Sequence, residues 1–151
     1  MHLIIKLLTT TVVLAATVAV VSAQEKKISR KRLPVAVEKT VAKESEGATI
    51  KGLSTEIENG TKFYEASLIV NGHTKDILID KDGNVVEVEE QVSMDSLPAD
   101  VQDSLKKAAG SGTIEGIESL TKNGNLVAYE AVVRKGKKRS EIKVGPNGEK
   151  L

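Results

Sequence analysis

An internal repeat constrains this chain more than any other feature of its sequence. TIKGL at residues 49–53 returns as TIEGI at residues 113–117. The same offset of 64 residues aligns Leu33-Pro34 with Leu97-Pro98 and Asn59-Gly60 with Asn123-Gly124. With one inserted residue further along, Tyr64-Glu65-Ala66 aligns with Tyr129-Glu130-Ala131. Similarity at a fixed period indicates two copies of one supersecondary unit. The sequence therefore predicts a tandem duplication, with repeat 1 at residues 33–92 and repeat 2 at residues 93–151.

Each copy begins with the pattern of a short amphipathic helix. A proline stands in the first turn, and apolar residues recur every four positions: Leu33, Val37 and Val41, then Leu97, Val101 and Leu105. Gly110 is placed to end the second helix.

The remainder of each copy alternates apolar and polar residues with a period of two, and Asn-Gly or Asp-Gly pairs separate the runs, as in antiparallel hairpins. We expect an α+β fold of two tandem α-β-β-β-β units, each with one helix packed on an antiparallel sheet. The two sheets are either separate or joined as one continuous curved sheet.

Both copies break the alternation at the same glycine. The apolar side chains at Ile50 and Leu53 are three residues apart, where two would keep the period, and Ile114 and Ile117 repeat this shift. A β-bulge at Gly52 and at Gly116 restores the alternation of apolar and polar residues. We expect substitution of either glycine by valine to strain the bulge. Close approach of the backbone to a ligand is the alternative reason for these glycines.

Residues 1–23 have the layout of a secretory signal peptide. His2 and Lys6 precede an apolar run that ends in small residues, so cleavage is expected after Ala23. An uncleaved membrane anchor is the alternative, because the apolar stretch approaches the length of a spanning helix. The location is therefore extracytoplasmic, either periplasmic or secreted, and residues 24–32 are expected to form a basic, flexible segment.

The motifs of the two copies resemble the PepSY-like family, which is itself similar to the repeats of a secreted beta-lactamase inhibitor. The resemblance rests on a helix that begins with Leu-Pro, a following G-x-T-I, then Tyr-Glu-Ala, and I-x-I-D-x-x-G-N-V. It implies a bacterial extracytoplasmic protein in which each unit wraps an antiparallel sheet around one helix. It also implies inhibition or regulation of a partner, which here would act in trans.

The composition excludes several kinds of chemistry. The chain has no cysteine, and His73 is its only histidine after the signal peptide. A disulfide, a conventional zinc site and a Ser-His-Asp triad are therefore excluded. We expect no catalytic residue, no cofactor and no metal, and we interpret His73 as an exposed turn residue.

One acidic motif has two interpretations. Asp80-Lys81-Asp82-Gly83-Asn84 resembles half of a calcium loop, but an EF-hand places its glycine at position six, whereas Gly83 stands at position four. A type I′ hairpin turn at Asp82-Gly83 is the alternative without a metal.

Charge is unevenly distributed along the chain. Residues 24–32 carry five basic and one acidic side chain, residues 33–92 carry six and twelve, and residues 93–151 carry ten and eight. Five cations gather on one predicted hairpin, and we predict that they bind an anionic envelope surface or an acidic partner: Arg134, Lys135, Lys137, Lys138 and Arg139. The alternative is a solvated hairpin tip whose lysines deter edge pairing.

The sequence alone is compatible with three functions. The favoured one is a non-catalytic binding module, secreted or periplasmic, that inhibits or regulates an envelope or secreted enzyme. The second is a charge-anchored structural protein of the envelope, whose membrane contact is at most peripheral after signal cleavage. The third is a carboxylate-based hydrolase. Nothing in the sequence indicates a nucleic-acid partner.

Overall fold

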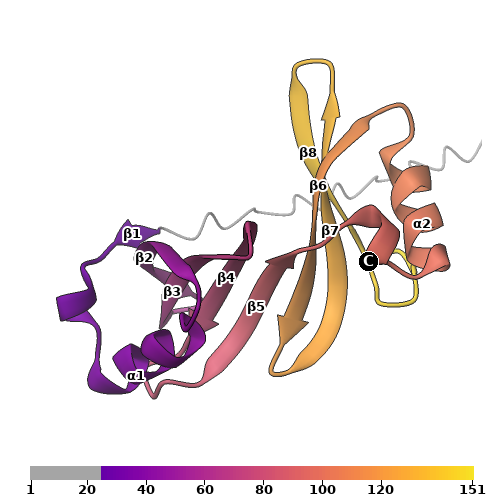
Figure 1. The fold of residues 1–151 in the computed structure, drawn as a ribbon. Helices are drawn as coiled ribbons and strands as arrows, with labels where there is room; N and C mark the ends of the chain where they lie inside the picture. Colours follow the sequence, from indigo (N-terminus) through magenta and orange to yellow (C-terminus); the bar gives the residue numbers. More distant parts are fainter. Residues whose placement is uncertain (1–24) are drawn as a thin grey trace, which may run out of the picture.

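A computed structural model describes residues 25–151, and the predicted signal peptide lies outside this range. These residues form one eight-stranded sheet and two α-helices (Figure 1). The strands follow each other in chain order from β1 to β8, and every adjacent pair is antiparallel. The sheet is not closed, since β1 and β8 are its two edges. The predicted α+β fold is confirmed, and its two halves share one continuous sheet.

The strands are β1 (Lys26–Lys27), β2 (Thr49–Glu58), β3 (Thr61–Val70), β4 (His73–Ile79), β5 (Val85–Gln91), β6 (Thr113–Lys122), β7 (Asn125–Lys135) and β8 (Lys138–Val144). The α-helices are α1 (Val35–Glu44) and α2 (Ala99–Ala109), and short 3-10 helices lie at Arg30–Arg32 and Met94–Ser96.

Both helices form where the sequence predicts, although each proline precedes its helix as the N-cap instead of standing in the first turn. Pro34 and Pro98 are the N-cap residues, and Gly110 ends α2 with a φ of 57°. The predicted apolar stripes are buried, because Val37 and Val41 on α1 and Val101 and Leu105 on α2 are at most 1% exposed.

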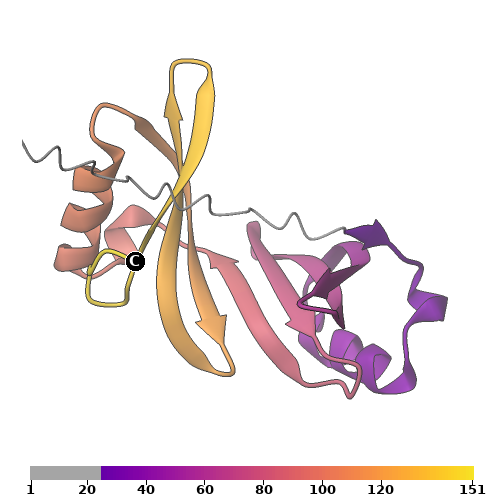
Figure 2. The ribbon, with the colours of Figure 1, turned by 180° about the vertical axis from the view of Figure 1, so that it is seen from behind.

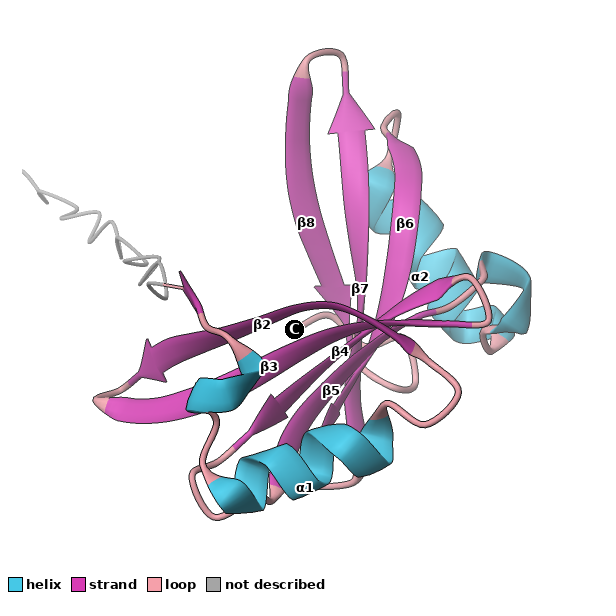
Figure 3. Cartoon of the chain, turned by 60° about the vertical axis from the view of Figure 1, so that its left-hand side comes forward, coloured by secondary structure: helices cyan, strands magenta, loops and turns pink. Residues whose placement is uncertain are grey.

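Each helix packs on its own half of the same sheet face. Val37 and Val41 contact Tyr64, Leu68 and Ile77 in one core. The second core joins Val101 and Leu105 to Leu97, Ile117, Tyr129, Ala131 and Val144. The sheet bends between the halves, and both helices lie on the outer side of the bend (Figure 3). The opposite face is uncovered in the described residues, as the reverse view also shows (Figure 2).

Tight turns connect most of the strands. Asn59-Gly60, Asn71-Gly72 and Asn123-Gly124 have positive φ at both central residues, as a type I′ hairpin turn requires. The type I′ turn expected at Asp82-Gly83 is wrong, because only Gly83 has a positive φ. Asp80 holds this turn instead: its Oδ1 accepts hydrogen bonds from the backbone N–H of Asp82 at 2.8 Å and of Asn84 at 2.9 Å.

The predicted bulges are present, but the reason given for their glycines is wrong. The register shifts between Ile50 and Gly52, and again between Ile114 and Gly116. Neither glycine has a positive φ, and a Cβ added at either would meet nothing within 4 Å. Neither the backbone φ nor the space at the Cβ position therefore requires a glycine at these two sites.

The two ends of the sheet differ from the predicted pattern. Residues 24–32 were expected to be flexible; the part of this segment that the structure describes, residues 25–32, includes β1, and Ile28 donates its backbone N–H to the Leu53 carbonyl at 2.9 Å and packs on the first core. In the second half a fourth strand was expected after Asn147-Gly148. The residues there form a turn and one isolated bridge, between Val144 and Lys150, so the second half supplies three strands.

Within residues 25–151 no helix is long and apolar enough to cross a membrane.

Candidate functional site

The uncovered side of the sheet, which we call the open face, carries a dense set of carboxylates. Because neighbouring residues of a strand point to opposite faces, the residues between the core positions all point to this side. Glu65 lies between the buried Tyr64 and Ala66, and Asp76 precedes the buried Ile77. The acidic residues on the open face are Glu56, Glu58, Glu65, Asp76, Glu87, Glu89, Glu118, Glu130 and Glu141.

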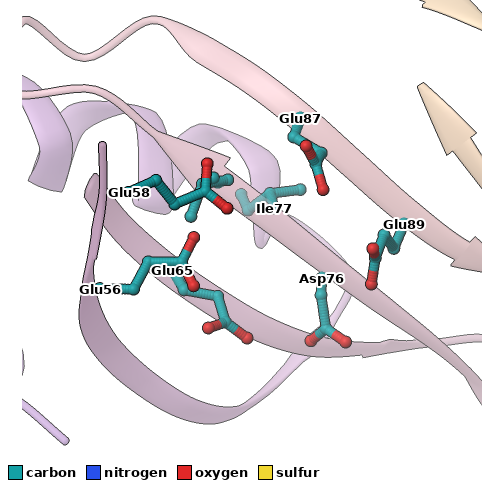
Figure 4. A pocket seen from close by; sticks show the side chains of 8 residues that line it. Glu56, Glu58, Glu65, Asp76, Ile77, Glu87 and Glu89 are labelled. Carbon is teal, nitrogen blue, oxygen red and sulfur yellow. The ribbon is translucent and has the colours of Figure 1, made fainter. Parts of the chain in front are cut away.

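Six of these carboxylates line a groove of about 220 Å³ on the first half of the sheet. Figure 4 shows the side chains of this acidic groove on β2, β3, β4 and β5, with carboxylates around a common space. They are Glu56, Glu58, Glu65, Asp76, Glu87 and Glu89. Among the described residues, the only salt bridge of these six joins Glu87 to Lys122 at 2.7 Å.

Carboxylates oppose each other directly across the strands of the open face. Asp76 on β4 is the register partner of Glu89 on β5, and Glu118 on β6 is the partner of Glu130 on β7. Like charges at directly opposite positions destabilise a sheet. The fold therefore retains two repulsive pairs on the face that the helices leave uncovered.

Apolar side chains form a floor between these carboxylates. Leu78 is 8% exposed and Leu120 is 3% exposed, although no helix covers them. Their register partners are Glu87 and Glu89, whose stems lie beside them on the open face. The floor partly buries the carboxylates and so raises the cost of ionising them.

The pKa values on the open face follow from this burial. Burial first, and then the neighbouring carboxylates, raise the pKa of Glu56 and of Glu118. Burial also raises the pKa of Glu65, against a hydrogen bond of 3.0 Å from the Ser54 hydroxyl. The largest effect is at Glu89, where burial and then Glu130, Glu87, Glu118 and Asp76 raise the pKa to about 7.

Glu89→Gln is expected to stabilise the protein at pH 8 and to leave its stability unchanged near pH 4. The folded pKa of about 7 lies above the ordinary glutamate value of 4.5, so the folded state loses stability as pH rises between these values. Solvent screening reduces the effect, and we expect a gain of about 1 kcal/mol above pH 7. The cations near Glu89 form salt bridges with other carboxylates: Lys122 with Glu87, and Lys143 with Glu130.

The measurement is urea unfolding from pH 4 to pH 8. Glu46→Gln, at an exposed position after α1, is the matched control for the loss of one carboxylate. Parallel pH profiles for the wild type and Glu89→Gln would contradict the assignment.

The second half of the open face is mixed in charge. A groove of about 250 Å³ there is lined by Glu115, Glu118, Glu130 and Glu141, together with Arg139. Lys143 forms a salt bridge with Glu130, and Arg134 and Arg139 both bridge Glu115. Most of the uncompensated negative charge of the open face therefore lies on the first half.

The five cations predicted as a binding site lie together on the β7–β8 hairpin, but in two groups. Arg134 and Arg139 are register partners, and both bind Glu115, which is the extra residue of the second bulge. Lys135, Lys137 and Lys138 are exposed at the tip and form no salt bridge with any described residue. The structure thus shows three free cations where the sequence indicated five.

No group of three or more histidine, aspartate or glutamate side chains in residues 25–151 is placed to hold a metal ion. The oxygens of Asp80 accept hydrogen bonds within their own turn, which lowers the pKa of this carboxyl. His73 is exposed at the start of β4, as predicted.

The acidic face was missed as a site in the sequence, although its signal is present there. Glu56 and Glu58, and also Glu87 and Glu89, are two residues apart on strands, which places each pair on one face. The net negative charge of residues 33–92 indicated an acidic repeat. Only the strand register shows that the carboxylates of four strands meet on one side.

No protein-family model matches this chain, and no curated protein matches its sequence. Solved structures with the same fold do match. A DUF2874 family protein from Bacteroides ovatus is 20% identical with a TM-score of 0.62, covering 79% of this chain and 84% of that one. A structure described as putative periplasmic proteins from Bacteroides eggerthii is 19% identical with a TM-score of 0.65, covering 79% and 86%.

A BLIP-like protein from Bacteroides fragilis is 21% identical with a TM-score of 0.56, and the alignment covers 77% of this chain and 81% of that one. At this identity the similarity shows the fold alone. The chain therefore has a BLIP-like fold.

Proposed function

We propose that this protein is a non-catalytic binding module that acts outside the cytoplasm and binds a protein partner with a basic surface through its open face. The observation that carries the proposal is the presence of two pairs of directly opposed carboxylates, Asp76 with Glu89 and Glu118 with Glu130. Such pairs cost stability, because like charges directly opposite each other repel. A cationic partner would relieve the repulsion between Asp76 and Glu89, and it would add to the Lys143 salt bridge that already reduces the repulsion at Glu130. Its binding therefore offsets a cost that the free protein carries.

The shape of the open face supports binding of a protein. The face lies on the inner side of the bent sheet and is grooved in both halves. Its apolar floor, with Leu78 and Leu120, lies under a polar rim, which is the usual anatomy of a protein interface. Aromatic anchors are nearly absent, since Phe63 is the only aromatic residue on this face. Electrostatic attraction would therefore supply much of the specificity.

An extracytoplasmic location agrees with two observations. The layout of residues 1–23 is that of a signal peptide, and one solved structure of the same fold is described as putative periplasmic. Cleavage would leave Gln24 as the first residue. Mass spectrometry of the protein from fractionated cells tests this directly, and a cytoplasmic protein with an intact Met1 would refute it.

Two finer statements belong to the same proposal. The two halves are copies of one PepSY-like unit, because each has one helix on the sheet and the same bulge in the strand that follows the helix. The bound partner is an envelope or secreted enzyme, which the module inhibits or regulates. The BLIP-like structural neighbour and the resemblance of the repeats to a beta-lactamase inhibitor support this class of partner.

Affinity capture from periplasmic and culture-supernatant extracts tests the proposal. Immobilised residues 24–151 should retain a partner in stoichiometric amount, and the triple variant Glu56→Gln, Glu65→Gln, Glu89→Gln should lose it. The matched control changes three acids remote from the face, Glu38, Glu46 and Asp103, to their amides. Equal retention by the two triple variants would exclude the open face as the binding surface.

Anchoring to an anionic envelope surface is the second candidate, and the free cations at the hairpin tip favour it. Lys135, Lys137 and Lys138 are exposed, and Arg134 and Arg139 lie directly behind them. In the first half the corresponding hairpin carries Asn71, Gly72 and His73, so a tip with little charge is compatible with the fold.

Changing Arg134, Lys135, Lys137, Lys138 and Arg139 to glutamine is expected to lower the salt concentration at which the protein elutes from heparin or from anionic liposomes. Each contact of an exposed cation with an anionic surface contributes about 1 kcal/mol and is screened within about 8 Å at physiological salt. Circular dichroism checks that the variant is folded. Elution at the wild-type salt concentration would leave the hairpin as a solvated tip.

A further inference from the structure

The free cations lie at the end of a projecting element. The β7–β8 hairpin extends beyond the neighbouring strand β6, whose first residue, Thr113, pairs with Arg134 (Figure 1). Lys135, Lys137 and Lys138 therefore lie past the end of that strand. Their ammonium groups are carried on flexible four-carbon stems, and these can adapt to a groove lined by acids.

The acidic groove offers the complementary charge. Five of its six carboxylates, those other than Glu87, form no salt bridge with any residue in 25–151. Neighbouring carboxylates contribute to the raised pKa values of Glu56, Glu65 and Glu89. An entering ammonium group would lower each of these repulsions at once.

The hairpin cannot reach the groove of its own chain. Figures 1 and 2 show the β7–β8 hairpin at one extremity of the molecule, directed away from β2 to β5, on which the groove lies. Two complementary surfaces that are fixed apart on one molecule can meet only between molecules. Such a contact is heterologous, so it leaves a free hairpin at one end and a free groove at the other.

We propose that the basic hairpin of one copy docks in the acidic groove of a second copy, so that the protein assembles head to tail. This inference rests on the proposed use of the open face as a binding surface, and it names a second copy as one occupant. The second-half groove is a poorer acceptor, because Arg134, Arg139 and Lys143 already compensate its acids. The assembly is an open chain that grows with protein concentration and shortens with salt.

Sedimentation velocity of residues 24–151 tests the proposal with two variants. The hairpin variant carries Lys135→Gln, Lys137→Gln and Lys138→Gln, and the groove variant carries Glu56→Gln, Glu65→Gln and Glu89→Gln. The wild type should associate increasingly with concentration at about 20 mM salt, and association should weaken about tenfold or more at about 500 mM salt. Each variant alone should remain monomeric.

A mixture of the two variants distinguishes docking from non-specific attraction. The hairpin variant keeps its groove and the groove variant keeps its hairpin, so the equimolar mixture should form dimers and nothing larger. A wild type that is monomeric at low salt, or a mixture that contains only monomers, would overturn the proposal. If the groove variant does not fold, Lys137→Glu combined in trans with Glu65→Lys replaces it, and association should return only in the mixture.

The capture experiment separates this inference from the proposed function. A hairpin variant that still captures a partner but does not self-associate agrees with both proposals. A wild type that captures a partner and remains monomeric at every salt concentration leaves the proposed function standing and overturns the assembly. The assembly proposal is also overturned if the groove variant no longer captures the partner but still self-associates as strongly as the wild type.

Discussion

Gly83→Ala and Gly148→Ala are each expected to lower the free energy of unfolding by about 2 kcal/mol or more. Both glycines have positive φ, 88° and 84°, and both lie against the first turn of a helix. A Cβ at Gly83 would be 2.8 Å from the carbonyl oxygen of Ala36, and a Cβ at Gly148 would be 2.6 Å from that of Asp100. Backbone atoms cannot move aside as the end of a flexible side chain can, so each helix would be displaced from its turn.

The first of these contacts also includes a hydrogen bond. The Thr40 hydroxyl donates to the Gly83 carbonyl at 2.6 Å and so ties α1 to the β4–β5 turn. Displacement of α1 would lengthen this bond and loosen the first core.

Gly52→Ala and Gly116→Ala are the matched controls, because both are strand glycines with open space at the Cβ position. Their free energies of unfolding, measured by urea titration, should stay within about 0.5 kcal/mol of the wild type. Equal losses at all four positions would contradict the distinction drawn between turn and bulge glycines.

Residues 93–151 expressed alone are expected to lose cooperative unfolding. Removal of β5 leaves β6 without its register partners, which run from Glu87 with Lys122 to Gln91 with Glu118. It also removes Val92, which packs against the second core. A unit of about 60 residues buries too little apolar surface to be more than marginally stable, so these losses are decisive.

Residues 85–151, which keep β5, provide the control for this experiment. Thermal denaturation followed by circular dichroism should show a transition for residues 85–151 at a lower temperature than for residues 24–151, and a broad one or none for residues 93–151. If residues 93–151 melt cooperatively at the temperature of the whole, the two halves are independent.

The helices and most strands could be predicted because their signals are local. The four-residue spacing of Val37 and Val41 and of Val101 and Leu105 identified the buried helix faces, and the Asn-Gly pairs located three hairpin turns. The internal repeat showed the same helix and turn patterns a second time. These features depend on residues near each other in the chain.

The errors concern contacts between distant residues. The position of Ile28 depends on its packing against a core built from α1 and β2 to β4, which no local pattern reports. Position 83 requires a glycine because the carbonyl of Ala36 lies against it, and Ala36 is far away in the sequence. The bulges at Gly52 and Gly116 were visible as a phase shift, whereas the conformation of their backbone was not.

The candidate site was harder to predict than the fold. The basic hairpin is a continuous run of sequence, so its charge was evident, but the bridges from Glu115 to Arg134 and Arg139 were not. The acidic groove is assembled from four strands and appears only when their registers are known.

Carbodiimide footprinting of the complex captured from extract tests the central claim, that the open face binds the partner, most directly. The reagent labels carboxylates that solvent reaches, and mass spectrometry compares the label at each acid in the free and bound protein. We predict that binding protects Glu56, Glu65 and Glu89, while Glu38, Glu46 and Asp103 on the helix side keep their label. Protection of the helix-side acids, with the open-face acids labelled as in the free protein, would contradict the account.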